Sequence, residues 1–214
     1  ASAVAKPTPG GHPLRMAREV SSTRRWSQED WVAFALGQLR EGGPGAVKLE
    51  TICRAAGKTR GSFYAHFSDH NAFLVTVVAA WVAQETTEPL AQIQDLPPGE
   101  PQRAALVRVA AGMDPVLHRQ VRRLAAGHRE TAEMLEDMDR TRIAAATQIY
   151  AATLGFAPDD IRTRDIATLA YSAVVGLHML APLPRTEADW GNLFGLMARA
   201  YADRQIDADP GQPT

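Results

Sequence analysis

The spacing of apolar residues along this chain is that of α-helices almost throughout. Apolar side chains recur every three or four residues, and the strict alternation of a half-buried strand is scarce. Leu49, Ile52, Cys53 and Ala56, for example, lie at i, i+3, i+4 and i+7, which places all four on one face of a helix. We therefore predict an all-α protein in which Cys53 is a small buried apolar residue.

Start and stop signals divide the N-terminal part of this pattern into short helices. Ser27, followed closely by two acidic residues, predicts a helix start, and the Gly-Gly-Pro-Gly run at 42–45 ends that helix. Gly57 ends the next one, and Thr59 caps a third that we expect to reach about residue 67. Two short helices joined by a three-residue turn containing glycine predict a helix-turn-helix.

Longer helices follow in the rest of the chain. Asp69 is placed to cap the first of them, and Pro89 predicts its end or a kink. The proline-rich run at 97–101 predicts a loop. Further helices are expected at about 102–112, 115–126, 128–154, 159–181 and 186–204.

Composition excludes few classes of protein. Hydrophobic residues make up 45% of the chain, which is enough for a core. The single cysteine allows no internal disulfide and agrees with a reducing compartment. The N-terminal residues contain no apolar run of signal-peptide length, so we expect a cytoplasmic protein. The uncharged stretch 166–183 includes several polar groups and a proline, so we interpret it as a buried helix and predict no membrane partner.

The charge is distributed unevenly. Residues 1–75 contain ten Lys and Arg against six Asp and Glu, which gives +4, whereas residues 76–214 contain 13 against 18, which gives −5. A basic N-terminal part on an acidic body is expected when only one end of a protein meets phosphate.

One segment resembles a known family. Residues 47–74 read VKLETICRAAGKTRGSFYAHFSDHNAFL, which is similar to the DNA-binding domain of the tetracycline-repressor (TetR) family. The most specific piece is Tyr-x-His-Phe at 64–67, following Thr-x-Gly-Ser at 59–62. The match is strong over about residues 27–80, and beyond them only the helical pattern and the overall length agree.

The residue types of the predicted recognition helix favour contact with DNA independently of the resemblance. Phe63 and Phe67 are four residues apart and share a face that can anchor the helix, whereas Gly61 and Ser62 leave the opposite face small and polar. Arg60 is long enough to reach a guanine edge or a phosphate. The alternative is that Arg60 is merely solvated.

The resemblance implies further contacts around this helix. It implies phosphate or backbone contacts for Lys48, His66 and His70, and a basic arm at Arg24 and Arg25. Lys58 departs from the family pattern and is either an added phosphate contact or simply exposed. Without a cysteine or carboxylate set, the two histidines predict no metal site. The predicted DNA-binding residues are Arg24, Arg25, Lys48, Lys58, Thr59, Arg60, Gly61, Ser62, Tyr64, His66 and His70.

For the body of the protein, the resemblance implies a ligand pocket and a dimer interface. The last two helices, at about 159–181 and 186–204, would pair with their copies. Polar or adaptable side chains within apolar stretches are the candidate pocket residues, although such residues belong more often to a core. They are Trp81, Met113, His118, His128, Tyr150, Tyr171, His178 and Met179.

These observations predict four parts: a flexible arm at 1–23, a helix-turn-helix DNA-binding domain at 24–68, a helical ligand-binding and dimerisation domain at 69–206, and a flexible tail at 207–214.

The predicted function is that of a homodimeric transcriptional regulator that binds a palindromic operator in double-stranded DNA. We expect a repressor released by a small, largely apolar effector of unknown identity. The alternatives are an activator of the same family, or a helical ligand-binding dimer that has lost DNA binding. Because no catalytic or nucleotide-binding motif occurs, we expect neither an enzyme nor a cofactor.

Overall fold

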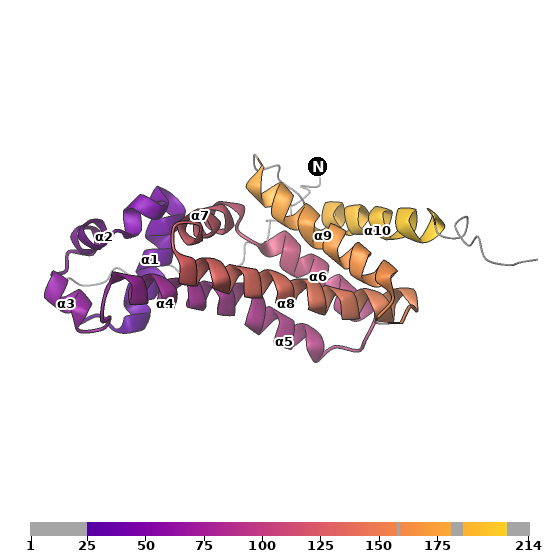
Figure 1. The fold of residues 1–214 in the computed structure, drawn as a ribbon, viewed down its shortest axis with the longest axis horizontal. Coiled ribbons are helices and arrows are strands. Elements are labelled where there is room, and N and C mark those ends of the chain that lie inside the picture. Colours follow the sequence, from indigo (N-terminus) through magenta and orange to yellow (C-terminus); the bar gives the residue numbers. More distant parts are fainter. Residues whose placement is uncertain (1–24, 158, 181–185, 205–214) are drawn as a thin grey trace, which may run out of the picture.

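The computed structural model describes residues 25–157, 159–180 and 186–204. Within these ranges every regular element is a helix, so the all-α prediction is confirmed. The molecule is elongated, with helices α1 to α3 at one end, α8 along the middle and α10 toward the other end (Figure 1). The predicted arm at 1–23, Arg24 and the predicted tail lie outside the described residues.

The signals read from the sequence determine the ends of the first two helices. Helix α1 (Gln28–Gly42) begins with a capping box, in which Ser27 Oγ accepts the Asp30 N–H and the Asp30 carboxylate accepts the Ser27 N–H. A 3₁₀ turn, η1 (Pro44–Val47), precedes α2 (Leu49–Ala56). Gly57 then ends α2 at φ 61°, a left-handed conformation that favours glycine.

The third helix is shorter than predicted. Helix α3 (Arg60–Tyr64) starts at Thr59, whose Oγ1 accepts the Ser62 N–H at 3.1 Å. It ends at Tyr64, because the His66 N–H donates to the carbonyl of Phe63, three residues earlier, in a tighter turn. The expected end near residue 67 was therefore wrong, although Phe67 still points into the core.

Pro89 has the predicted effect on helix α4 (His70–Val82). The helix begins at Asp69, which accepts the Ala72 N–H at 2.8 Å, and it continues without a break into a π-helical turn, η2 (Ala83–Thr87). Helix α5 (Glu88–Gln94) follows. A proline has no N–H to donate and its ring clashes with the carbonyl four residues earlier, here that of Glu85. The π turn therefore lies where the regular hydrogen-bond ladder cannot continue.

The body is built around α8 (Arg129–Leu154), the longest helix. It is packed against α4, α6 (Glu100–Gly112), α7 (Pro115–Ala125) and α9 (Ile161–Met179), while α10 (Glu187–Arg204) packs on α6 and α9. Figure 1 shows α9 crossing the half of α8 that is farther from helices α1 to α3. In the described part of the chain, no helix is long and apolar enough to span a membrane.

Buried apolar residues form two main clusters. The first unites α1 to α4 with α7 and α8 and extends from Trp26 to Met138. The second lies between α6, α8, α9 and α10 and includes Ile166, Val174 and Phe194. Because the first cluster joins the helix-turn-helix to the body, movements of α4 and α7 are mechanically linked to the predicted DNA-binding end.

Candidate nucleic-acid interface and effector cavity

The recognition helix α3 is anchored by an aromatic cluster. The Phe63 ring is fully buried, and its centroid lies 5.5 Å from that of Trp31, 5.1 Å from that of Phe67 and 5.0 Å from that of Phe73. Such edge-on and tilted contacts are favourable for aromatic rings. They attach a helix of only five residues, which is too short to be stable alone.

The opposite side of α3 is open to solvent. Tyr64 is 49% exposed, with its ring edge-on to Phe63 at 5.4 Å. A Cβ atom added at Gly61 would meet only Thr59 Oγ1, at 3.7 Å, so the helix backbone is free to approach another molecule closely.

Arg60 lies across the two helices of the motif. Its guanidinium forms an ion pair with Glu50 of α2, and both side chains are more than half exposed. An exposed pair of this kind contributes only about 0–1 kcal/mol. Arg60 can therefore exchange Glu50 for a phosphate or a guanine edge at little cost.

The remaining cations of the predicted interface differ in what they contact. Lys48 is exposed at the start of α2, and Arg25 is exposed ahead of α1. Lys58 is half-buried, with its ammonium 5.5 Å from the centroid of the Trp26 ring. This cation–π contact gives Lys58 a structural partner at the turn position where it departs from the family pattern.

The two histidines near α3 have different surroundings. His70 Nε2 lies 2.9 Å from the carbonyl oxygen of Val47 and ties the start of α4 to η1. This hydrogen bond takes one ring nitrogen, so we do not carry the DNA contact of His70 forward. His66 is half-buried, and its ring centroid lies 6.4 Å from that of Phe67. No group of three metal-binding side chains comes together among the described residues.

The body contains a cavity bordered by η2, α5, α6, α8, α9 and α10. Its empty volume, counted together with the open mouth, is about 580 Å³. Three of the predicted residues, Met113, Tyr150 and Tyr171, line it. The rest of the lining is mostly aliphatic, with two charged exceptions, Glu85 and Arg142.

Other predicted pocket residues lie beside the cavity. Trp81, His118 and His178 are buried in a line of ring contacts that continues to Trp190, with centroid distances of 5.5, 5.3 and 5.7 Å in order. Trp81 belongs to the cluster that includes the helix-turn-helix, and Trp190 belongs to the cluster between α6, α8, α9 and α10.

Two predicted pocket residues are misplaced. His128 is the N-terminal cap residue of α8, and Met179 is 41% exposed at the end of α9. Neither lines the cavity. Helical spacing alone did not show which side of each helix faces the cavity.

A polar network lies next to the cavity. The Arg122 guanidinium donates to Asp139 at 2.6 Å and to the Tyr171 hydroxyl at 3.1 Å, and that hydroxyl donates to Asp139 at 2.5 Å. Arg122 Nε also donates to His118 Nε2 at 2.8 Å, so the neutral imidazole carries its proton on Nδ1. Burial and nearby Arg122 lower the pKa of His118 to about 2, and burial raises the pKa of Tyr171 to about 12.

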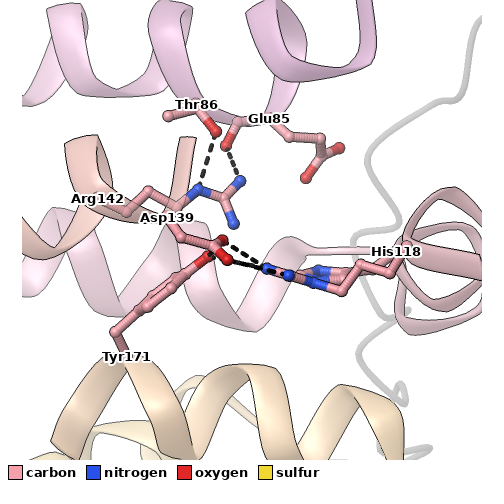
Figure 2. A network of polar contacts seen from close by, with 7 residues as sticks. Glu85, Thr86, His118, Asp139, Arg142 and Tyr171 are labelled. Carbon is pink, nitrogen blue, oxygen red and sulfur yellow. Dashed lines mark hydrogen bonds and ion pairs between the residues drawn. The ribbon is translucent and has the colours of Figure 1, made fainter. Parts of the chain in front are cut away.

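Arg142 is the residue that sequence reasoning missed. It is only 9% exposed, and it donates through Nε to Thr86 Oγ1 at 2.8 Å and through Nη2 to the Glu85 carbonyl at 2.7 Å. Figure 2 shows its guanidinium facing these two residues, with Asp139 and Tyr171 on its other side. This carbonyl is the one that Pro89 leaves without its helical partner.

A signal for Arg142 was present in the sequence. Buried residues on α8 occur at Thr131, Leu135, Met138, Arg142, Ala146 and Ile149. An arginine in the buried register of a helix needs a partner or a function. Residue type alone does not separate Arg142 from the exposed arginine of the same helix, Arg140.

Comparison with known proteins identifies the family. The model for bacterial regulatory proteins of the tetR family matches residues 32–77, which run from α1 through the helix-turn-helix into α4. Residues 32–77 therefore form a DNA-binding domain of the TetR family. TetR-family members are DNA-binding transcriptional regulators, and the match lies on the segment where Phe63 is buried and Arg60 and Tyr64 face solvent.

Solved structures share the fold of this chain. A proposed transcriptional regulator from Pseudomonas aeruginosa PAO1 aligns with a TM-score of 0.67 at 17% identity, covering 86% of this chain and 98% of that one. A proposed TetR-family regulator from Mesorhizobium loti MAFF303099 aligns with a TM-score of 0.59 at 14% identity, covering 87% and 98%. FadR from Bacillus subtilis, solved with stearoyl-CoA, aligns with a TM-score of 0.59 at 13% identity, covering 82% and 97%. No curated protein sequence matches the chain.

Proposed function

We propose that this protein is a homodimeric TetR-family repressor that binds a palindromic operator and is released by a small effector held in the cavity of its body. The observation that carries the proposal is the division of α3 into a buried aromatic face and an exposed face with Arg60 and Tyr64. A helix held in this way can enter the major groove without losing its anchor. Thr59, Gly61 and Ser62 belong to the same exposed turn, and Lys48 and Arg25 supply phosphate contacts beside it.

Homodimerisation is supported by apolar side chains on α9 and α10. Ile161 and Leu169 of α9 are 58% and 51% exposed, and Leu196 of α10 is 60% exposed. A second copy covering these residues would remove apolar surface from water. Val174, by contrast, is 6% exposed and belongs to the core of its own chain. The dimer contact that we propose therefore involves the outward faces of α9 and α10.

Two connections join the cavity to the DNA-binding end. Helix α4 packs against α1 and passes directly into η2, which forms one wall of the cavity. Arg40 of α1 forms an ion pair with Asp114, the N-terminal cap residue of α7. An effector that changes the position of η2 would thus shift the recognition helices of a dimer away from their spacing of about 34–36 Å on successive turns of DNA. Coupling of this kind is typically about 1–3 kcal/mol.

The test is a fluorescence-anisotropy titration with the labelled intergenic DNA beside the gene of this protein. Unlabelled random DNA is the competitor, and two salt concentrations are compared. We expect a Kd of about 10⁻⁸ M or tighter with a steep dependence on salt. Binding no tighter than to random DNA, both here and in a genomic selection of bound fragments, would contradict the proposal.

Arg60→Ala separates DNA contact from folding. Because Arg60 is exposed and forms an ion pair with the similarly exposed Glu50, the variant should fold and dimerise normally. Specific affinity should fall by about 1–3 kcal/mol if the guanidinium contacts a base. Glu50→Gln is the matched control, since it removes the same ion pair and leaves Arg60 in place. An unchanged operator affinity in Arg60→Ala would remove this residue from the interface.

A further inference from the structure

The charge of Arg142 is buried without an opposite charge in contact. Its guanidinium donates to a hydroxyl and to a backbone carbonyl, both of which are neutral, and Nη1 has no hydrogen-bond partner among the described residues. An arginine stays protonated at any physiological pH. A buried cation of this kind is costly unless something neutralises it.

Among the described residues, no carboxylate forms an ion pair with Arg142. Asp139 already accepts from Arg122 and from the Tyr171 hydroxyl. Glu85 borders the same cavity, but no ion pair joins its carboxylate to Arg142 in the described structure. Burial raises the pKa of the Glu85 carboxyl, although the charge of Arg142 acts to lower it. The centroid of the Tyr171 ring lies 5.9 Å from the Arg142 guanidinium carbon, which gives a weaker cation–π compensation.

The surroundings of Arg142 define the rest of a ligand. The cavity wall beyond Arg142 and Glu85 is made of side chains such as Leu106, Val109 and Phe194. This wall suits an aliphatic or aromatic group of the ligand. The cation in the cavity lining that could bind a charged group is Arg142. The two ends of the cavity therefore fit different parts of a ligand. Arg142 fits an anionic group, and the wall along α6 and α10 fits an apolar group.

We propose that the effector is an amphipathic carboxylic acid, whose carboxylate pairs with Arg142 and whose apolar part fills the cavity. This inference rests on the proposed function, because it names the class of effector that binds in the same cavity. Arg142 Nη1 is closed off from solvent, so the carboxylate reaches it by a small movement of the wall. The part of that wall in contact with the guanidinium is η2, because Arg142 donates to Thr86 and Glu85. The ligand thus competes for the guanidinium that holds η2, and through η2 it acts on α4.

The experiment is calorimetric titration of the full-length protein with hexanoate, octanoate, decanoate and 4-phenylbutanoate, each beside its neutral primary amide. A charge-assisted pair is worth about twice a neutral hydrogen bond, so at least one acid should bind roughly 10- to 100-fold more tightly than its amide. Arg142→Gln should abolish this preference, and Arg142→Lys should retain part of it. Arg140→Gln, a change of the same kind on an exposed residue of α8, should leave it unchanged.

Several outcomes overturn the proposal. The proposal is wrong if the amides bind as tightly as the acids, or if octylamine binds more tightly than octanoate. It is also wrong if none of the acids binds with a Kd below about 1 mM. The comparison of acid with amide uses the unaltered protein, so it holds even if Arg142→Gln fails to fold. Ligand binding is measured without DNA, and operator release is then measured by anisotropy. An acid that binds through Arg142 but leaves operator affinity unchanged would uphold the anion site and refute the repressor mechanism.

Discussion

His118 should make the stability of this protein sensitive to mild acid. Its imidazole is 1% exposed, it accepts a hydrogen bond from Arg122, and burial lowers its pKa to about 2. In the unfolded chain the pKa of a histidine is about 6.5. Between these two values only the unfolded chain binds the proton, so acid favours unfolding. Stability that is present at neutral pH is therefore lost as the pH falls below about 6.5.

The size of the effect follows from the unfolded pKa alone, because native His118 stays neutral throughout the range. Lowering the pH from about 7 to about 5 costs about 2 kcal/mol for one such histidine. Burial also lowers the pKa of His178, which adds in the same direction. The raised pKa of Glu85 acts in the opposite direction, because the folded state binds that proton more readily. The test must therefore compare variants rather than absolute slopes.

The variant is His118→Gln, whose amide oxygen can accept from Arg122 Nε but does not titrate. Urea unfolding followed by tryptophan fluorescence gives the free energy of unfolding at each pH, at one protein concentration because dimers gain stability with concentration. His118→Gln should lose about 2 kcal/mol less than the unaltered protein between about pH 7 and pH 5. His128→Gln, at the start of α8, is the control and should follow the unaltered protein. Equal losses in His118→Gln and the unaltered protein would refute the idea that native His118 resists protonation.

Three further substitutions test other parts of the structure. Thr59→Ala removes the cap of α3 and should cost about 1 kcal/mol in urea unfolding, whereas Thr59→Ser should cost less; equal losses would mean that Oγ1 does not cap the helix. Phe63→Ala empties the centre of the aromatic cluster and should cost about 3–5 kcal/mol, so a loss below about 1 kcal/mol would contradict the packing described. Leu196→Glu places a charge on the proposed dimer face and should shift sedimentation toward the monomer, while an unchanged dimer would exclude this face.

Much of the DNA-binding end was predictable because its signals are local. Ser27, Gly57, Thr59 and Asp69 end or start helices as expected, since a cap acts on the backbone within three residues and a left-handed turn concerns one residue. The inward orientation of Phe63 also followed from helical spacing. The early end of α3 did not, because the tighter turn after Tyr64 depends on how Phe67 packs in the core.

The cavity was only partly predictable. Met113, Tyr150 and Tyr171 line it, but the same reasoning also selected His128 and Met179, which do not. Residue type indicates that a side chain can serve a pocket, and spacing indicates which residues share a face. Neither indicates which faces of different helices meet around an empty space.

The sequence by itself determined the helical class, the helix-turn-helix and the outward position of Arg60, because periodicity and capping operate over a few residues. Only the tertiary structure decided what Arg142 does. Pro89 leaves the Glu85 carbonyl without a helical partner, and packing of α8 brings Arg142 to that carbonyl from 57 residues away along the chain. A buried charge and a broken helix are each visible in the sequence. That they meet at the wall of one cavity is a consequence of how the helices pack.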